Sequence, residues 1–193
     1  SLRRFNFRRT FRRTFAFSVH SSGAQPMKIK KDPPPPWRFI FAHPSHFIAC
    51  GMGGGLSPII SGTAGTLFAW LLFPLLQIVF AGNDAGFAVF LLLAFAYGVY
   101  ACDQTGRALG VADHGAIVWD EIVPFWLVLF MTPPDLLWQL GAFLLFRFFD
   151  IVKPPPANWF DEKIKNGLGV MMDDVIAAGY AILVIALVKA LLG

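Results

Sequence analysis

The chain has 193 residues, enough for one domain and a tail, and 56% of them are hydrophobic while only 15% are charged. An ordinary soluble domain has about 45–50% apolar and about 25% charged residues, and the net charge of +4 is due to a basic N-terminal segment. This composition argues against a disordered protein, a disulfide scaffold and a typical soluble enzyme. It predicts a compact polytopic membrane protein.

Basic residues concentrate at the start of the chain. Residues 1–31 contain nine Lys or Arg and no acid. Residues 1–26 lack the uninterrupted apolar run of a secretory signal, so we interpret them as an extension upstream of Met27 or as a segment that lies on anionic lipid heads. Residues 33–36 are all proline and predict a polyproline II spacer. We therefore expect a disordered tail and spacer over residues 1–36 and a membrane domain over residues 37–193.

Five apolar stretches follow and predict an all-α fold, a polytopic bundle of about four to five hydrophobic helices. None shows the period-2 alternation of barrel strands, and open sheets cannot face lipid. Several are close to or below the spanning minimum of about 17 residues, so re-entrant helices remain an alternative for the shorter ones. The stretches are Ala64–Ala81, Ala85–Ala101, Ile117–Met131, Leu136–Val152 and Val175–Leu192.

The distribution of charge predicts an orientation and a site. If the N-terminus lies in the cytoplasm and all five stretches cross, Lys189 is the one basic residue on the far side, which satisfies the positive-inside rule. Ten of the twelve acids also fall on the cytoplasmic side. Because acids do not follow that rule, their clustering predicts a functional site at the cytoplasmic membrane surface.

Two adjacent acids, Asp120 and Glu121, interrupt the third apolar stretch. An acid inside a membrane segment is costly and usually functional. Asp113 lies seven residues earlier and would share their helix face if the helix extended back that far. The alternative is a pair of exposed acids that interact with a helix dipole.

Basic residues follow in the fourth stretch, where Arg147, Asp150 and Lys153 recur at every third position. Arg binds phosphate in a bidentate way and Lys binds it as a point charge. Arg147 and Lys153 are therefore predicted to bind a phosphate group, with a plain salt-bridge stripe as the alternative.

A second acid pair, Asp173 and Asp174, opens the last helix, where the alternative is simple N-capping. Acid pairs without matching His or Cys favour Mg²⁺, which prefers oxygen ligands and is commonly shared with substrate phosphate. The Gly-rich segment at residues 51–66 contains Thr63 and Thr66 just before a helix, which is a candidate anion site or merely a flexible entry loop. Together these features predict a Mg²⁺-assisted reaction of a lipid phosphate.

Four sequence blocks resemble the phosphatidylglycerophosphatase A family of lipid phosphatases, over most of the domain. They are GMGGGLSPIISGTAGTL at Gly51–Leu67, DHGAIVWDE at Asp113–Glu121, FRFFDIVKPPP at Phe146–Pro156 and GLGVMMDD at Gly167–Asp174. The resemblance implies hydrolysis of phosphatidylglycerophosphate to phosphatidylglycerol and phosphate. It also implies a Mg²⁺ requirement, a role in phospholipid synthesis and a location in the bacterial inner membrane.

The chain departs from the family pattern at a few positions. Pro124 and Asn166 stand where the family commonly has Gly, and Pro155-Pro156 varies the sequence after Lys153. No carboxylate of the blocks is lost, but Pro124 puts the helix geometry after Glu121 in question.

The site assignment then follows. We expect Asp120, Glu121, Asp173 and Asp174 to form the catalytic and metal-binding shell, with Asp113 and Asp150 in support and with Arg147, Lys153, Thr63 and Thr66 on the phosphate. The signatures of aspartyl-phosphate, cysteine and phosphohistidine phosphatases are missing. A metal-bound water is therefore the preferred nucleophile, with an Asp nucleophile as the alternative.

Two other functions stay open. A small cation or proton transporter would spread its acids through the membrane depth, and a membrane phosphoalcohol transferase would carry a DGxxAR…GxxxD…D pattern that this sequence lacks. The expected partners are a phospholipid substrate and membrane lipid, with no nucleic acid. The sequence predicts no oligomeric state.

Overall fold

The computed structural model describes residues 33–57 and 60–192, and this part of the chain is all-α. The predicted disordered tail therefore lies, for residues 1–32, outside the described residues. Pro36 has an extended backbone (φ −62°, ψ 145°), and the first helix begins at Trp37. The elements are α1 Trp37–Ile40, α2 Pro44–Ala49, the 3₁₀ helix η1 Gly51–Leu56, α3 Ser61–Val79, α4 Asp84–Leu109, α5 Trp119–Met131, α6 Leu136–Val152, α7 Ala157–Lys163 and α8 Gly167–Leu192.

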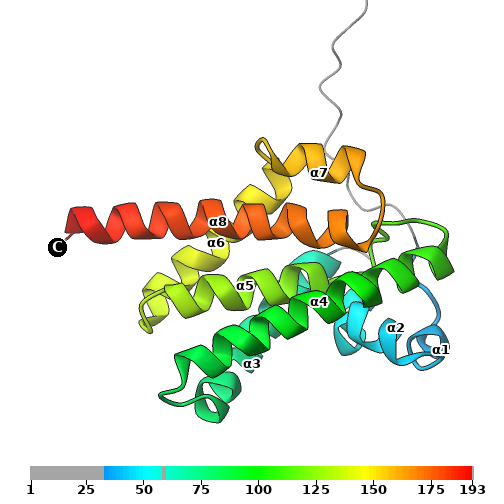
Figure 1. Cartoon of the computed structure of the whole chain (residues 1–193), viewed down its shortest axis with the longest axis horizontal. Helices are drawn as coiled ribbons and strands as arrows, with labels where there is room; N and C mark the ends of the chain where they lie inside the picture. Colours follow the sequence, from blue (N-terminus) through cyan, green and yellow to red (C-terminus); the bar gives the residue numbers. More distant parts are fainter. Residues whose placement is uncertain (1–32, 58–59, 193) are drawn as a thin grey trace, which may run out of the picture.

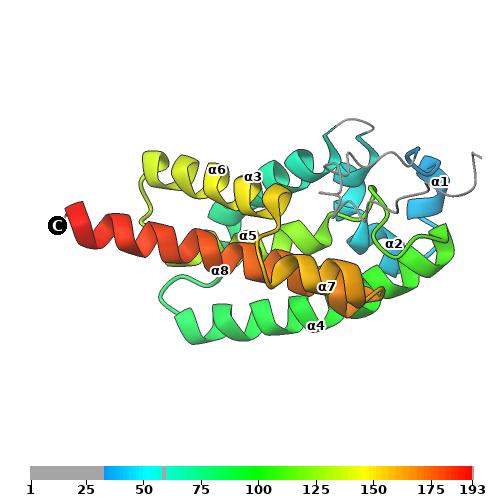
Figure 2. The ribbon, with the colours of Figure 1, turned by 90° about the horizontal axis from the view of Figure 1, so that it is seen from above.

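The five predicted apolar stretches correspond to α3, α4, α5, α6 and α8, which run up and down along one axis of the molecule (Figures 1 and 2). The α3–α4 turn, the α5–α6 turn and the C-terminus lie at one end. The N-termini of α3, α5 and α8 and the C-termini of α4 and α6 lie at the other end, which we call the site end. The acid pairs of α5 and α8 therefore share the site end.

Helix α5 is the centre of the bundle. Ten of its thirteen residues are buried, and it packs against α3, α4, α6 and α8. A helix that is apolar on all sides belongs in a core, and thirteen residues extend only about 20 Å. The hydropathy of this stretch thus reflects burial inside the protein.

Three helices within the described residues, α3, α4 and α8, are long and apolar enough to cross a membrane. Helix α6 is shorter, and it leaves an apolar stripe exposed along its outer side. This stripe consists of Leu136, Leu137, Leu140, Leu144 and Phe148. The outward faces of the bundle are thus apolar, as a lipid environment requires.

Two helix boundaries differ from the expectation in ways that affect the site. Helix α4 continues past Ala101 to Leu109 and ends at Gly110 in the left-handed conformation (φ 74°), which glycine adopts easily. Helix α5 begins only at Trp119, so Asp113 is not on its face. The residues before α5 form a loop that is held by Val118 N–H, which donates to the Ala49 carbonyl at 2.9 Å.

Pro124 and Asn166, the two unusual residues near the acid pairs, both fit the observed helices. Pro124 lies inside α5, which nevertheless continues to Met131, so the backbone after Glu121 stays helical. Asn166 precedes α8 and caps it, because its side-chain oxygen accepts hydrogen bonds from the N–H groups of Leu168 at 3.1 Å and Gly169 at 3.2 Å. The first turn of α8 is therefore capped by Asn166, and the capping alternative for Asp173 and Asp174 is wrong.

Candidate active site

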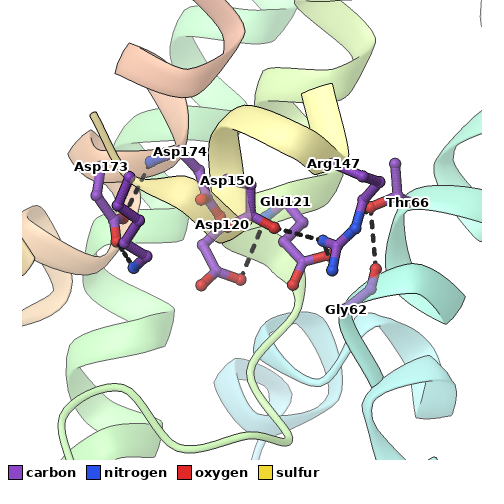
Figure 3. A network of polar contacts seen from close by, with 9 residues as sticks. Gly62, Thr66, Asp120, Glu121, Arg147, Asp150, Asp173 and Asp174 are labelled. Carbon is purple, nitrogen blue, oxygen red and sulfur yellow. Dashed lines mark hydrogen bonds and ion pairs between the residues drawn. The ribbon is translucent and has the colours of Figure 1, made fainter. Parts of the chain in front are cut away.

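Glu121 connects three helices at the site end. Its Oε2 accepts hydrogen bonds from Arg147 Nη1 of α6 at 2.6 Å and from Thr66 Oγ1 of α3 at 3.0 Å. The Thr66 hydroxyl also lies 2.9 Å from the Gly62 carbonyl, so its one proton is shared between two acceptors. Glu121 is only 2% exposed, and these contacts fix its carboxylate where α3, α5 and α6 meet (Figure 3).

Arg147 forms ion pairs with two acids. Besides Glu121, its Nη1 contacts Asp150 Oδ2 on the next turn of α6 at 2.5 Å. The salt bridge weighed as the alternative therefore forms, but the guanidinium also reaches across to α5. The Nε of Arg147 is buried without a hydrogen-bond partner among the described residues. The guanidinium thus retains an N–H group from which a ligand oxygen could accept a hydrogen bond.

Lys153 does not continue the stripe along α6. Its ammonium forms an ion pair with Asp173 of α8 and lies 3.5 Å from Asp161 of α7. Burial by itself lowers the pKa of Lys153, but Asp173, Asp174 and Asp113 outweigh it and raise this pKa above its ordinary value. The ammonium is therefore charged at neutral pH, and the loop residue Asp113 influences the site from outside α5.

Asp120 lies between the two ion-paired groups, with Asp173 on one side and Glu121 on the other (Figure 3). It is 4% exposed, and its Oδ1 accepts the Glu121 N–H at 3.2 Å. Asp173 and Asp174 are 4% and 3% exposed. The structure thus brings both predicted acid pairs to one buried patch.

The two threonines differ in position. Thr66 is fully buried and is engaged by Gly62 and Glu121, so it contacts the carboxylate network. Thr63 is half-buried in the first turn of α3. Both lie in the first turns of α3, and Thr66 is the one with a hydrogen bond to an acid of the site among the contacts of the described residues.

The Gly-rich segment is packed closely against the loop before α5. A Cβ atom on Gly55 would lie 1.9 Å from the Ala116 carbonyl oxygen, and one on Gly51 would lie 2.6 Å from Val118 Cγ2. Gly51 also has a left-handed backbone (φ 55°). These glycines therefore allow the backbone to pass close to the segment that carries the first acid pair.

Sequence reasoning missed two contributors. Gly62 lies against the site, because a Cβ atom there would be 2.2 Å from Glu121 Oε1 and 2.9 Å from Arg147 Nη2. Asp161 of α7 contacts Lys153. Gly62 stood inside the block GMGGGLSPIISGTAGTL, so its small size was a usable signal, whereas nothing local connected Asp161 to the site.

The residues present suit a hard cation by charge and by donor type. The buried patch supplies carboxylate oxygens in excess of its two cationic side chains, Arg147 and Lys153, and such oxygens are the ligands of Mg²⁺. Within the described residues, however, no group of three or more His, Cys, Asp or Glu side chains has its donor atoms already gathered for a metal ion. A bound cation would therefore require rearrangement of the ion-paired carboxylates.

Comparisons with known proteins indicate the family of this chain. The family model described as phosphatidylglycerophosphatase A matches residues 47–189, which contain every acidic and basic residue of this candidate site. Phosphatidylglycerophosphatase A of Haemophilus influenzae is 46% identical over 149 residues, which cover 74% of this chain and 87% of the relative. Phosphatidylglycerophosphatase A of Escherichia coli is 40% identical over 144 residues, which cover 72% and 80%.

A third relative differs in name. A Bacteroides thetaiotaomicron protein, provisionally named a phosphatidylinositol-3-phosphatase, is 38% identical over 152 residues, which cover 76% of this chain and 94% of the relative. No solved structure matches the chain. The match of the family model over most of the domain, with two relatives of the same name, shows that the chain belongs to the phosphatidylglycerophosphatase A family of phosphatases.

Proposed function

We propose that this chain hydrolyses the phosphate monoester of phosphatidylglycerophosphate and releases phosphatidylglycerol and inorganic phosphate. The observation that carries the proposal is the buried patch in which acids from α5 and α8 surround two cations, Arg147 and Lys153. The names of the Haemophilus influenzae and Escherichia coli relatives support the substrate. The apolar faces of the bundle suit a substrate whose acyl chains stay in the bilayer.

The two cations would hold the phosphate. Arg147 offers the unused Nε donor and Lys153 offers a charge that neighbouring acids maintain. A water oxygen would attack phosphorus, the bond from phosphorus to the glycerol oxygen would break, and the leaving oxygen would take a proton. Asp120 lies between the two cation-bearing groups, so it is placed to accept the proton of the attacking water (Figure 3).

Mg²⁺ is part of the proposal. Asp120, Asp173 and Asp174 would hold the ion, because these three buried acids carry more negative charge than the Lys153 ammonium beside them can neutralise. Asp113 and Asp150 are close enough to act electrostatically on Asp173. Glu121 is engaged by Arg147 and Thr66, so its contribution would be to fix the guanidinium. When bound, the ion would supply charge neutralisation at the phosphate oxygens.

We infer that the site faces the cytoplasm, and the distribution of charge supports this orientation. The end opposite the site carries few charges, among them Asp84, Asp135 and Lys189, whereas the basic residues of the tail precede the site end. The positive-inside rule then favours a site that faces the cytoplasm, in a bacterial inner membrane, with a role in phospholipid synthesis. Cysteine labelling of the α5–α6 turn from either side of sealed vesicles would test this orientation.

The decisive experiment measures phosphate release by the purified full chain in mixed micelles. Phosphatidylglycerophosphate and phosphatidylinositol 3-phosphate are compared, each with Mg²⁺ and with a chelator. We expect release from phosphatidylglycerophosphate that needs Mg²⁺ and that is abolished by Asp120→Asn and by Asp173→Asn while both variants still insert. Faster release from the inositol lipid would reject the substrate, and near-normal turnover by both variants would reject the site.

A further inference from the structure

Lys153 has a backbone conformation that lysine rarely adopts. Its φ of 47° and ψ of 62° place it in the left-handed region at the end of α6. Such a conformation is sterically unfavourable for a non-glycine residue and persists only where the surroundings fix it. Its N–H donates to the Phe149 carbonyl at 2.8 Å, which closes the turn. Something outside the turn must therefore stabilise it.

The turn decides where the ammonium points. A residue that continued α6 in the right-handed conformation would project from the side of that helix. The left-handed turn instead leads the chain into α7 and directs Lys153 to Asp173 of α8 and Asp161 of α7. Figures 1 and 2 both show α7 lying against the site-end half of α8.

Tyr180 of α8 contacts this turn on both sides. Its hydroxyl donates to the Pro155 carbonyl at 2.6 Å, two residues after Lys153. Its ring stacks on Phe149, four residues before Lys153, with ring centroids 5.3 Å apart and planes at 26°. One side chain therefore spans the segment in which the strained residue lies.

The register of α8 places Tyr180 and Asp173 on the same face of this helix. Tyr180 follows Asp173 by seven residues, which is close to two helical turns, so both lie on one face about 10 Å apart. Asp173 meets the Lys153 ammonium and Tyr180 meets the turn that carries it. This face of α8 thus contacts both the ammonium of Lys153 and the backbone of the turn that carries it.

We propose that Tyr180 is a positioning residue for the reaction, which holds the left-handed turn and thereby places the Lys153 ammonium at the phosphate. The inference rests on the proposed function, in which Lys153 binds that phosphate. In the part of the chain that the structure describes, the hydrogen bond and the ring contact of Tyr180 are made with Pro155 and Phe149, outside the acid patch. Its hydroxyl is therefore expected to affect phosphate binding only through Lys153.

A double-mutant cycle on the full chain tests this dependence. Tyr180→Phe keeps the stacked ring and removes the hydroxyl, and Lys153→Gly keeps a left-handed turn without strain and removes the ammonium. Both changes are made alone and together, with Tyr100→Phe, an exposed tyrosine of α4, as the matched control. Phosphate release is followed with enzyme in excess so that slow variants remain measurable, and inhibition by inorganic phosphate is measured in parallel.

We expect Tyr180→Phe to lower kcat/KM about three- to tenfold and to weaken phosphate inhibition when Lys153 is present. In the Lys153→Gly background the same change should alter kcat/KM less than about twofold, because no ammonium remains to be placed. The inference would be overturned if Tyr180→Phe lowered kcat/KM equally in both backgrounds. It would also be overturned if Tyr180→Phe left kcat/KM unchanged in the chain that retains Lys153. A wild-type chain that releases no phosphate from either lipid would instead reject the proposed function.

Discussion

Gly62 and Glu121, which come from α3 and α5, are in contact so close that no side chain fits between them. A Cβ atom on Gly62 would lie 2.2 Å from Glu121 Oε1. A flexible carboxylate could normally move away, but Arg147 and Thr66 hold the other oxygen of this one. The absence of a side chain at position 62 is thus a condition for the observed network.

Gly62→Ala should therefore damage the site. Overpacking of this kind costs about 1–3 kcal/mol, and the displaced carboxylate would release Arg147. We expect phosphate release to fall at least about tenfold and the unfolding midpoint to drop by a few degrees. Gly141→Ala in α6 is the control, because a Cβ atom there meets nothing within 4 Å. Equal activities for the two variants would contradict the network.

Thr66 offers a test of the shared hydroxyl proton. Thr66→Val keeps the shape and removes the donor to Glu121 and Gly62, which should cost about 1–3 kcal/mol because the site is buried. Thr66→Ser keeps the donor and loses one methyl group, so it should retain more activity than Thr66→Val. Thermal unfolding and phosphate release of the two variants are compared. A serine variant that is no better than the valine variant would show that packing alone matters here.

We expect that lysine cannot replace Arg147 without loss of activity. Its Nη1 contacts Glu121 and Asp150 together, and a lysine ammonium has neither the planar fork nor the remaining Nε donor. We expect Arg147→Lys to reduce kcat/KM at least about tenfold. Arg107→Lys is the matched control, since Arg107 is 74% exposed and pairs with Asp103 within α4 at 2.8 Å. An unchanged kcat/KM in Arg147→Lys would remove the guanidinium from the proposed phosphate contacts.

Cys50 provides a prediction on pH. Burial, and then the nearby charge of Asp120, raise the pKa of the Cys50 thiol from 9.0 to about 12. Because the folded-state pKa is raised, the thiol favours folding below about pH 9, and this contribution is lost as the pH rises toward 12. Unfolding midpoints of the wild type should therefore fall more steeply between pH 9 and pH 11 than those of Cys50→Ala. Parallel curves would show that the thiol titrates as an exposed one.

Much of the fold was predictable because hydrophobic periodicity and length depend on local sequence. The five apolar stretches became helices, and the acid pairs and the spaced Arg147 and Lys153 identified the segments that meet at the site end. The all-α class was confirmed, and three helices are long and apolar enough to cross a membrane. The family resemblance, read from four blocks, was confirmed by the comparisons.

Sequence by itself thus determined the class of fold, the family and the chemical groups available. Only the tertiary structure decided that α5 is a buried core helix, that Glu121 is engaged by Thr66 and Arg147, and that a left-handed residue directs Lys153 to α8. The physical reason is that these contacts join residues 20 to 55 positions apart. Hydropathy cannot separate a helix buried in protein from one exposed to lipid, and the direction of a side chain after a helix end depends on what packs against the turn.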